Sequence, residues 1–147
     1  MLNILMNVIA AFVSTVSFCI LFHVDRKHFP LCGAVGAAGW LCFILLRPYV
    51  SPAEASFCAT VSVVVLSRFF AIRMKCPVTV FMIVGILPIV PGAGIYWTAY
   101  YAITQQAALA ISRGLDTIQI AVAIVLGIVF ISEIPVKFFK YEPKTSE

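Results

Sequence analysis

Long apolar runs alternate with short polar breaks along this chain. The clearest runs cover residues 2–22, 30–46 and 52–70, and the polar bends HVDRKHF (23–29) and RPY (47–49) separate them. A helix needs about 20 predominantly apolar residues to cross the hydrocarbon core of a bilayer. The pattern therefore predicts a series of membrane-spanning helices.

The region 77–112 interrupts this pattern. Its first 14 residues are apolar, but within GILPIVPGAGIYWT (85–98) the prolines Pro88 and Pro91 are followed by two glycines, Gly92 and Gly94. Each proline removes a backbone donor and clashes with the carbonyl four residues back, and glycine adds flexibility and permits positive φ. We predict one helix broken at 88–94, a second break at 113–116, a last span at 117–138 and a polar tail at 139–147.

The composition makes a bilayer the solvent for most of this chain. Of 147 residues, 63% are hydrophobic and only 11% are charged, and the mean hydropathy is +1.08. A soluble domain of this size cannot bury so much apolar surface. We expect one integral membrane domain over residues 1–147, an all-α polytopic helix bundle of about five spans. Residues 1–22 are expected to remain as the first span, because a signal peptide would carry Lys or Arg before Arg26.

The positions of Lys and Arg predict how the spans cross. With five crossings, eight basic residues lie on one side and two, Arg47 and Arg113, lie on the other; with six crossings the division is six against four. Because cytoplasmic loops are enriched in basic residues, we predict five crossings, an outside N-terminus and a cytoplasmic C-terminus. The region 77–112 then crosses the membrane once in net terms, although it has more residues than one crossing needs. The eight residues are Arg26, Lys27, Arg68, Arg73, Lys75, Lys137, Lys140 and Lys144.

No pattern of catalytic or metal-binding residues is visible. The five cysteines lie in or beside apolar segments without a CxxC pair, as buried thiols acting as small hydrophobes do. There is no nucleophile with a neighbouring base, no HExxH and no phosphate loop. Basic runs that would bind nucleic acid are also missing. We therefore expect a protein that is not an enzyme and uses neither a cofactor nor a metal.

The broken helix is the strongest candidate site. Freed backbone groups at membrane depth need partners in protein or water, so broken helices there usually line a cavity. If Pro91 begins a new helix, the free amides after it favour an anion, and transporters hold substrate carboxylates in this way. Pro88, Pro91, Gly92 and Gly94 are then the substrate-binding candidates. The alternative is a kink or a turn between helices near the surface.

An aromatic and polar segment follows the break. Tyr96 and Tyr100 share one helix face, and Gln105 continues the polar character. These three residues are candidates for lining the substrate path. The alternatives are an aromatic belt at the membrane interface, which suits Trp97 best, and hydrogen bonding between helices for the glutamine.

Segment 30–46 contains GAVGAAG, in which small residues recur along one helix. Gly33, Gly36 and Gly39 are three residues apart, and Gly33 with Ala37 forms a small-xxx-small pair. Such surfaces let helices approach closely. We expect tight packing here, either within the chain or against a partner. That partner is either a different subunit or a second copy of this chain.

Three acidic residues have simple structural interpretations. Glu54 completes a capping box with Ser51, and Asp116 is expected to begin the last helix. Glu133 either pairs with Lys137 four residues on or relays protons.

Two stretches resemble the threonine/serine exporter (ThrE-type) family. They are PIVPGAGIY (88–96), between a short apolar helix beginning CPVTVF and a longer, moderately polar helix, and FCILFHVDRKHFPLCGAVGAAGW (18–40). The length resembles the short branch, in which the exporter is split into two polypeptides. The chain is similar to the small membrane subunit of a bacterial succinate exporter. Pro88, Pro91, Gly92 and Tyr96 match the family motif.

The resemblance implies a function, a partner and a location. It implies a transmembrane subunit of a secondary exporter for small carboxylates, either an amino acid such as threonine or serine or a dicarboxylate such as succinate. It also implies a larger partner subunit with a soluble N-terminal region, in a bacterial inner membrane. The alternative is a scaffold that assembles this partner without transporting anything itself.

Overall fold

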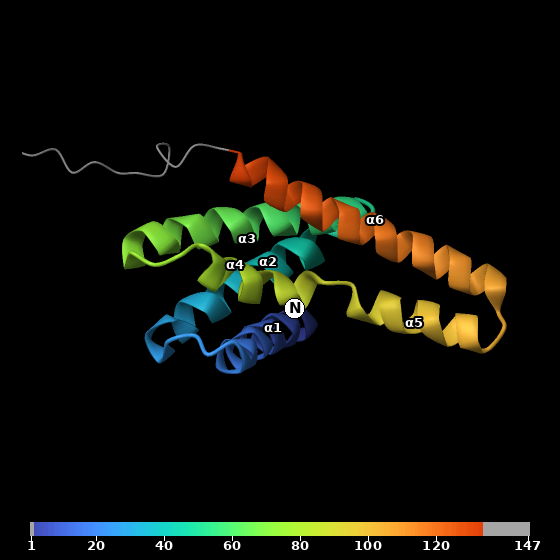
Figure 1. Ribbon diagram of the computed structural model, residues 1–147, viewed down its shortest axis with the longest axis horizontal. Helices are drawn as coiled ribbons and strands as arrows, with labels where there is room; N and C mark the ends of the chain where they lie inside the picture. Colours follow the sequence, from blue (N-terminus) through green and yellow to red (C-terminus); the bar gives the residue numbers. More distant parts are fainter. Residues whose placement is uncertain (1, 134–147) are drawn as a thin grey trace, which may run out of the picture.

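The computed structural model describes residues 2–133, and this part of the chain is helical without strands (Figure 1). The prediction of an all-α fold is therefore confirmed. The elements are α1 (Leu2–Leu21), η1 (Arg26–His28), α2 (Phe29–Leu46), α3 (Pro52–Met74), α4 (Thr79–Ile86), η2 (Leu87–Ile89), α5 (Gly92–Ile103) and α6 (Ala107–Ser132), where η marks a short 3₁₀ helix.

Five crossings are available, one of them through a broken helix. Helices α1, α2, α3 and α6 are each long and apolar enough to span a bilayer. The pair 79–89 and 92–103 passes the same test together and is bent by 47°. In Figure 1, α5 leads away from the end of α4, and α6 returns beside α5 and then beside α3. The prediction of about five spans with one broken helix is confirmed.

The predicted break at 113–116 is wrong, because α6 continues through it. Gly114 and Asp116 both lie inside this helix. A glycine inside a helix costs only about 1 kcal/mol relative to alanine, and the apolar sequence on both sides of it favours continuation. The chain turns earlier instead, between Ile103 and Ala107. Gln105 adopts a left-handed conformation there (φ 59°), so the segment between the two predicted breaks is divided between α5 and α6.

Helix α3 has the start that its sequence predicts. The Ser51 side chain accepts a hydrogen bond from the Glu54 N–H (3.3 Å), and the Glu54 carboxylate accepts one from the Ser51 N–H (2.9 Å). Pro52 occupies the first turn, where its missing donor is harmless. The helix runs past the predicted end near residue 70 and stops at Lys75, which is left-handed (φ 52°).

The glycines of α2 bring three helices together within the chain. A Cβ on Gly33 would come within 2.6 Å of the Phe12 ring in α1, and one on Gly36 would overlap the Thr15 side chain. Gly39 faces Val63 of α3 in the same way. Ala37 is half-buried.

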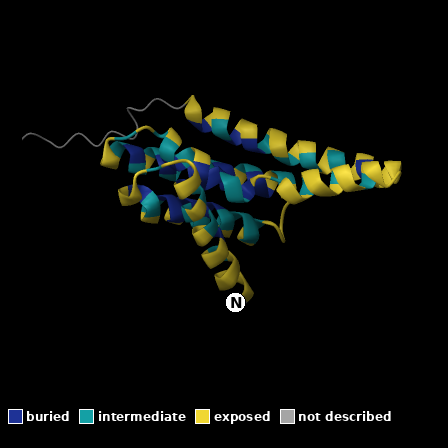
Figure 2. Cartoon of the chain, turned by 60° about the horizontal axis from the view of Figure 1, so that its bottom comes forward, coloured by how far each residue is buried: buried dark blue, intermediate teal, exposed yellow. Residues whose placement is uncertain are grey.

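Burial divides the molecule into two regions (Figure 2). Helices α2, α3 and α4 hold most of the buried side chains, including Val35, Val63 and Phe81. By contrast, α5 has no buried residue, and in the described chain it packs against α6 alone. We call residues 92–120, which comprise α5, the turn and the first half of α6, the hairpin. Figures 1 and 2 show that the far end of the hairpin projects beyond the bundle.

Candidate functional site

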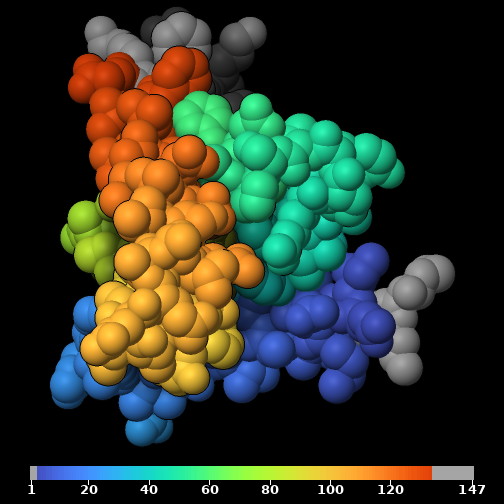
Figure 3. Space-filling view, turned by 90° about the vertical axis from the view of Figure 1, so that its right-hand side faces the viewer, coloured from blue at the N-terminus to red at the C-terminus, as the bar shows by residue number. Residues whose placement is uncertain are grey.

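A cavity of about 570 Å³ lies where the broken helix, the hairpin and the α2–α3 connection meet. Figure 3 shows the surface at this end of the molecule, with the hairpin beside α2 and α3. The volume falls in the range of small-molecule sites, about 300–1,000 Å³. We call it the break cavity. Its lining comprises Trp40, Phe43, Arg47, Ser51, Pro52, Ala53, Ser56, Pro88, Ile89, Val90, Pro91, Gly92, Ala93, Gly94, Trp97, Arg113, Asp116, Thr117, Gln119 and Ile120.

The break supplies one wall of this cavity. Pro88 lies in η2, and the chain then becomes extended at Val90 (φ −57°, ψ 131°). Pro91 is the residue before α5 and is not helical (ψ 57°), so α5 begins at Gly92, one residue later than predicted. The Gly92 N–H bonds to the Val90 carbonyl (2.8 Å).

The amides of Ala93 and Gly94, between the bonded N–H groups of Gly92 and Ile95, lie in the first turn of α5. Pro91 contributes no side-chain cap, and the first turn of any helix leaves its N–H groups without helical partners. Ala93 and Gly94, in this first turn, both line the break cavity. The start of α5 therefore places partial positive charge at the cavity wall.

The two glycines of the break have different surroundings: Gly94 is in close contact with α6, and Gly92 faces open space. None of the glycines in residues 2–133 has a positive φ, so the freedom that glycine offers is not used at the break. A Cβ on Gly94 would overlap the Thr117 side chain of α6, and one on Gly92 would meet nothing within 4 Å. Gly94 thus lets α5 approach α6, while Gly92 leaves room in the cavity.

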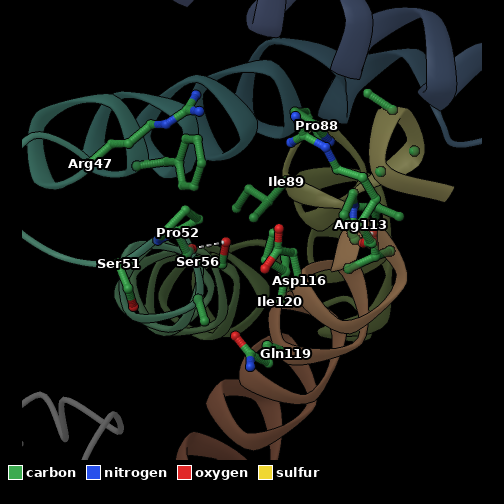
Figure 4. A pocket seen from close by; sticks show the side chains of 18 of the residues that line it. Arg47, Ser51, Pro52, Ser56, Pro88, Ile89, Arg113, Asp116, Gln119 and Ile120 are labelled. Atoms are coloured by element: carbon green, nitrogen blue, oxygen red, sulfur yellow. Dashed lines mark hydrogen bonds between the residues drawn. The ribbon is translucent and has the colours of Figure 1, made fainter. Parts of the chain in front are cut away.

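Two arginines face the cavity from different helices (Figure 4). Arg47 ends α2, and its guanidinium lies 5.9 Å from the centre of the Phe43 ring. Arg113 lies in α6 and reaches toward Pro88 in the view of Figure 4. Sequence reasoning did not place either arginine in the site. The available signal was that these are the two basic residues assigned to the side opposite the other eight.

Asp116 also lines the break cavity, although the sequence suggested only a helix start. It lies in the second half of the hairpin, and Figure 4 shows its carboxylate pointing into the space between α3 and α6. Within residues 2–133 it makes no ion pair with a basic side chain within 4.0 Å. Asp116 is an exposed residue, so its carboxylate is accessible, and its place in the cavity wall makes it a functional candidate.

Pro88, Pro91, Gly92 and Gly94 are brought together here, whereas the other three substrate candidates are absent from the lining. The rings of Tyr96 and Tyr100 stack on each other (6.4 Å) on the exposed flank of α5. Gln105 lies in the turn after α5, away from the break. Trp97 is three residues beyond Gly94 and shares its face, so this aromatic residue lines the cavity instead.

Glu133 lies at the other end of α6, as the residue that follows its last turn. Nearby, Arg68 donates from Nη2 to the Ser132 carbonyl (2.8 Å), which joins α3 to the end of α6. Lys137, the expected partner of Glu133, lies outside the described residues. Among those described, no three His, Cys, Asp or Glu side chains gather as a metal site.

Comparison with known proteins gives one match. The model of the family described as "Threonine/Serine exporter, ThrE" matches residues 7–134, which is most of the chain. Neither the search of curated proteins nor the search of solved structures found a significant match.

Proposed function

The chain belongs to the threonine/serine exporter family, and from this premise we propose that it forms the transmembrane pathway of an exporter for small carboxylates, with the break cavity as the substrate site. Membership implies a multi-pass membrane exporter rather than an enzyme. The proposed substrates are amino acids such as threonine or serine and dicarboxylates such as succinate. The observation that carries the proposal is that two arginines and the uncapped start of α5 face one cavity.

These groups suit a carboxylate chemically. A guanidinium presents planar donors that match the two carboxylate oxygens, and charge-assisted bonds of this kind are the strong ones. Arg47 and Arg113 offer two such donors, and the amides of α5 add fixed dipoles. Trp40 and Trp97 supply apolar wall for the carbon skeleton.

We further propose that the cavity faces the outside of a bacterial inner membrane. The bend after α1 and the end of α3, which carry Arg26, Lys27, Arg73 and Lys75, lie at the opposite end of the bundle from the α2–α3 connection (Figure 1). Basic residues favour the cytoplasmic side. A carboxylate in the break cavity would therefore be at the point of release.

The bare flank of α5 supports a second role, in assembly with a larger partner subunit. Tyr96 and Ile103 are 62% and 81% exposed. A larger subunit with a soluble N-terminal region is the proposed partner. If this chain only assembles that subunit, the subunit alone would export the substrate once it is stably inserted.

Efflux from proteoliposomes tests the proposal. Vesicles loaded with radiolabelled serine, threonine or succinate would hold the chain, the larger subunit or both. We expect export only when this chain is present. Arg113→Gln should reduce export by about tenfold to 100-fold, because a hydrogen bond to a charged group contributes about 1.5–3 kcal/mol.

The matched control is Arg73→Gln, which removes an exposed arginine from the last turn of α3, outside the cavity lining. It should export at the unmodified rate. Equal rates for the two variants would refute the cavity as the carboxylate site. Full export by the larger subunit alone would favour the assembly role.

A further inference from the structure

We propose that Asp116 determines which carboxylates the break cavity accepts, by binding the ammonium group of an amino acid and repelling a second carboxylate. This inference rests on the proposed function, because it assigns a selectivity to the same cavity. The Asp116 carboxylate points into the cavity and has no ion-pair partner within 4.0 Å among residues 2–133.

Asp116 is an exposed residue of α6 that has no evident part in stabilising the helix. An acidic side chain stabilises a helix when it lies in the first turn, but Asp116 is the tenth residue of α6. Its own helix offers Arg113 one turn earlier, yet the two groups form no ion pair within 4.0 Å. The carboxylate is therefore left available to a ligand.

The charges around the cavity match a zwitterion. Arg47 enters from α2 and Arg113 from α6, while Asp116 is the acidic residue of the lining. The polar groups Ser51, Ser56, Thr117 and Gln119 are uncharged, and Ser56 already donates to the Pro52 carbonyl (2.7 Å). An amino acid carries one carboxylate for the arginines and one ammonium for Asp116. A dicarboxylate would place a like charge against Asp116, and such a contact is unfavourable.

The test compares serine with succinate in the same vesicles. Proteoliposomes holding the full chain, with the larger subunit where export needs it, are loaded with both labelled compounds. Asp116→Asn should lower the serine-to-succinate export ratio by about tenfold or more, because a hydrogen bond to a charged group is lost. Asp116→Glu retains the charge and should keep the ratio near that of the unmodified chain.

Two controls separate selectivity from damage. Asp25→Asn removes an exposed carboxylate, paired with Lys27 in the bend before α2, and should leave the ratio unchanged. A second arm needs no variant: the unmodified chain should export N-acetylserine, which lacks the ammonium group, about tenfold more slowly than serine. This arm decides the question if Asp116→Asn does not reach the vesicles.

The outcomes distinguish the two proposals. If the unmodified protein exports none of serine, threonine and succinate, both the proposed function and this inference are refuted. Export with an unchanged ratio in Asp116→Asn, an equal fall for both compounds, or equal rates for serine and N-acetylserine would overturn the role of Asp116 alone. Export of succinate without either amino acid would do the same.

Discussion

Helix α2 and helix α5 are both apolar and glycine-containing, yet they occupy opposite environments. At Gly36 of α2, a side chain of α1 lies where a Cβ would be, and at Gly39 a side chain of α3 does. At Gly92 of α5, the same position is open space. The comparison teaches that a glycine in an apolar helix has no fixed meaning, because its neighbours decide whether it allows packing or leaves a cavity.

The difference suits an exporter that needs both a rigid frame and an accessible site. Buried side chains of α2, α3 and α4 interlock, and such packing resists small changes of volume. Helix α5 has one neighbouring helix in the described chain and no buried residue. Regions with few buried contacts open at lower free energy than a core does. We therefore expect enlargement of Gly36 in α2 to act on stability and enlargement of Gly92 in α5 to act on export.

Gly36→Leu should have the largest effect. The new side chain must displace Thr15 of α1 from a closely packed contact, and overpacking of this kind typically costs about 1–3 kcal/mol and occasionally more. We expect loss of folded protein from the membrane and a lower melting temperature in detergent. Ala34→Leu, at an exposed position of the same helix, is the matched control. Similar melting temperatures for the two variants would show that α2 is not the tightly packed element.

Gly92→Leu should have the opposite pattern of effects, with stability unchanged and export reduced. A Cβ there meets nothing within 4 Å, so the variant should fold and melt like the unmodified chain. Its side chain would occupy the break cavity and should reduce carboxylate export by about tenfold or more, which corresponds to about 1.4 kcal/mol of lost binding.

Ala99→Leu is the control for this variant, because it enlarges an exposed residue of α5 that is outside the cavity lining. It should export normally. If Gly92→Leu also exports normally, the cavity is not on the substrate path.

These residues also show how far sequence reasoning reaches. The broken helix was predictable because proline acts locally, through a missing donor and a fixed φ. The turn after α5 was not, since Gln105 gives no strong turn signal while Gly114 seemed to be a break. Local chemistry predicts a helix interruption well where proline causes it, and poorly where tertiary packing decides.

The candidate site was predictable only in part. Pro88 and Gly92 are adjacent to the break and line its cavity. Arg47 and Arg113 are distant in sequence, and they line one cavity because α6 returns beside α3, whose start follows the end of α2. The sequence favoured Tyr96 for the substrate path and Trp97 for the membrane interface, whereas Trp97 lines the cavity. The face of α5 that meets α6 is the one on which Gly94 contacts Thr117, and no pattern within α5 reveals it.

Gly94→Ala should have an intermediate effect and test whether the hairpin has a packed contact of its own. The added methyl meets the Thr117 side chain, so we expect a loss of about 1–1.5 kcal/mol, at the lower end of overpacking costs. Thr117→Ala should restore part of this loss by making room. The four melting temperatures of a double-mutant cycle measure the coupling, and residues in contact typically couple by about 0.5–3 kcal/mol. Strictly additive effects would mean that α5 is not held against α6 at this point.

Ser51→Ala should have the smallest effect, at the boundary between the two regions. Ser51 caps α3 and also lines the break cavity. Loss of an N-cap costs about 1 kcal/mol, which lowers the melting temperature by about 2–4 °C in a domain of this size. Ser51→Thr keeps the capping oxygen and should remain close to the unmodified chain in stability. If Ser51→Ala lowers export more than Ser51→Thr after correction for protein amount, the hydroxyl acts on the substrate. If the two variants export alike, Ser51 only caps α3, and the substrate-binding groups of this wall are the arginines rather than the serine hydroxyl.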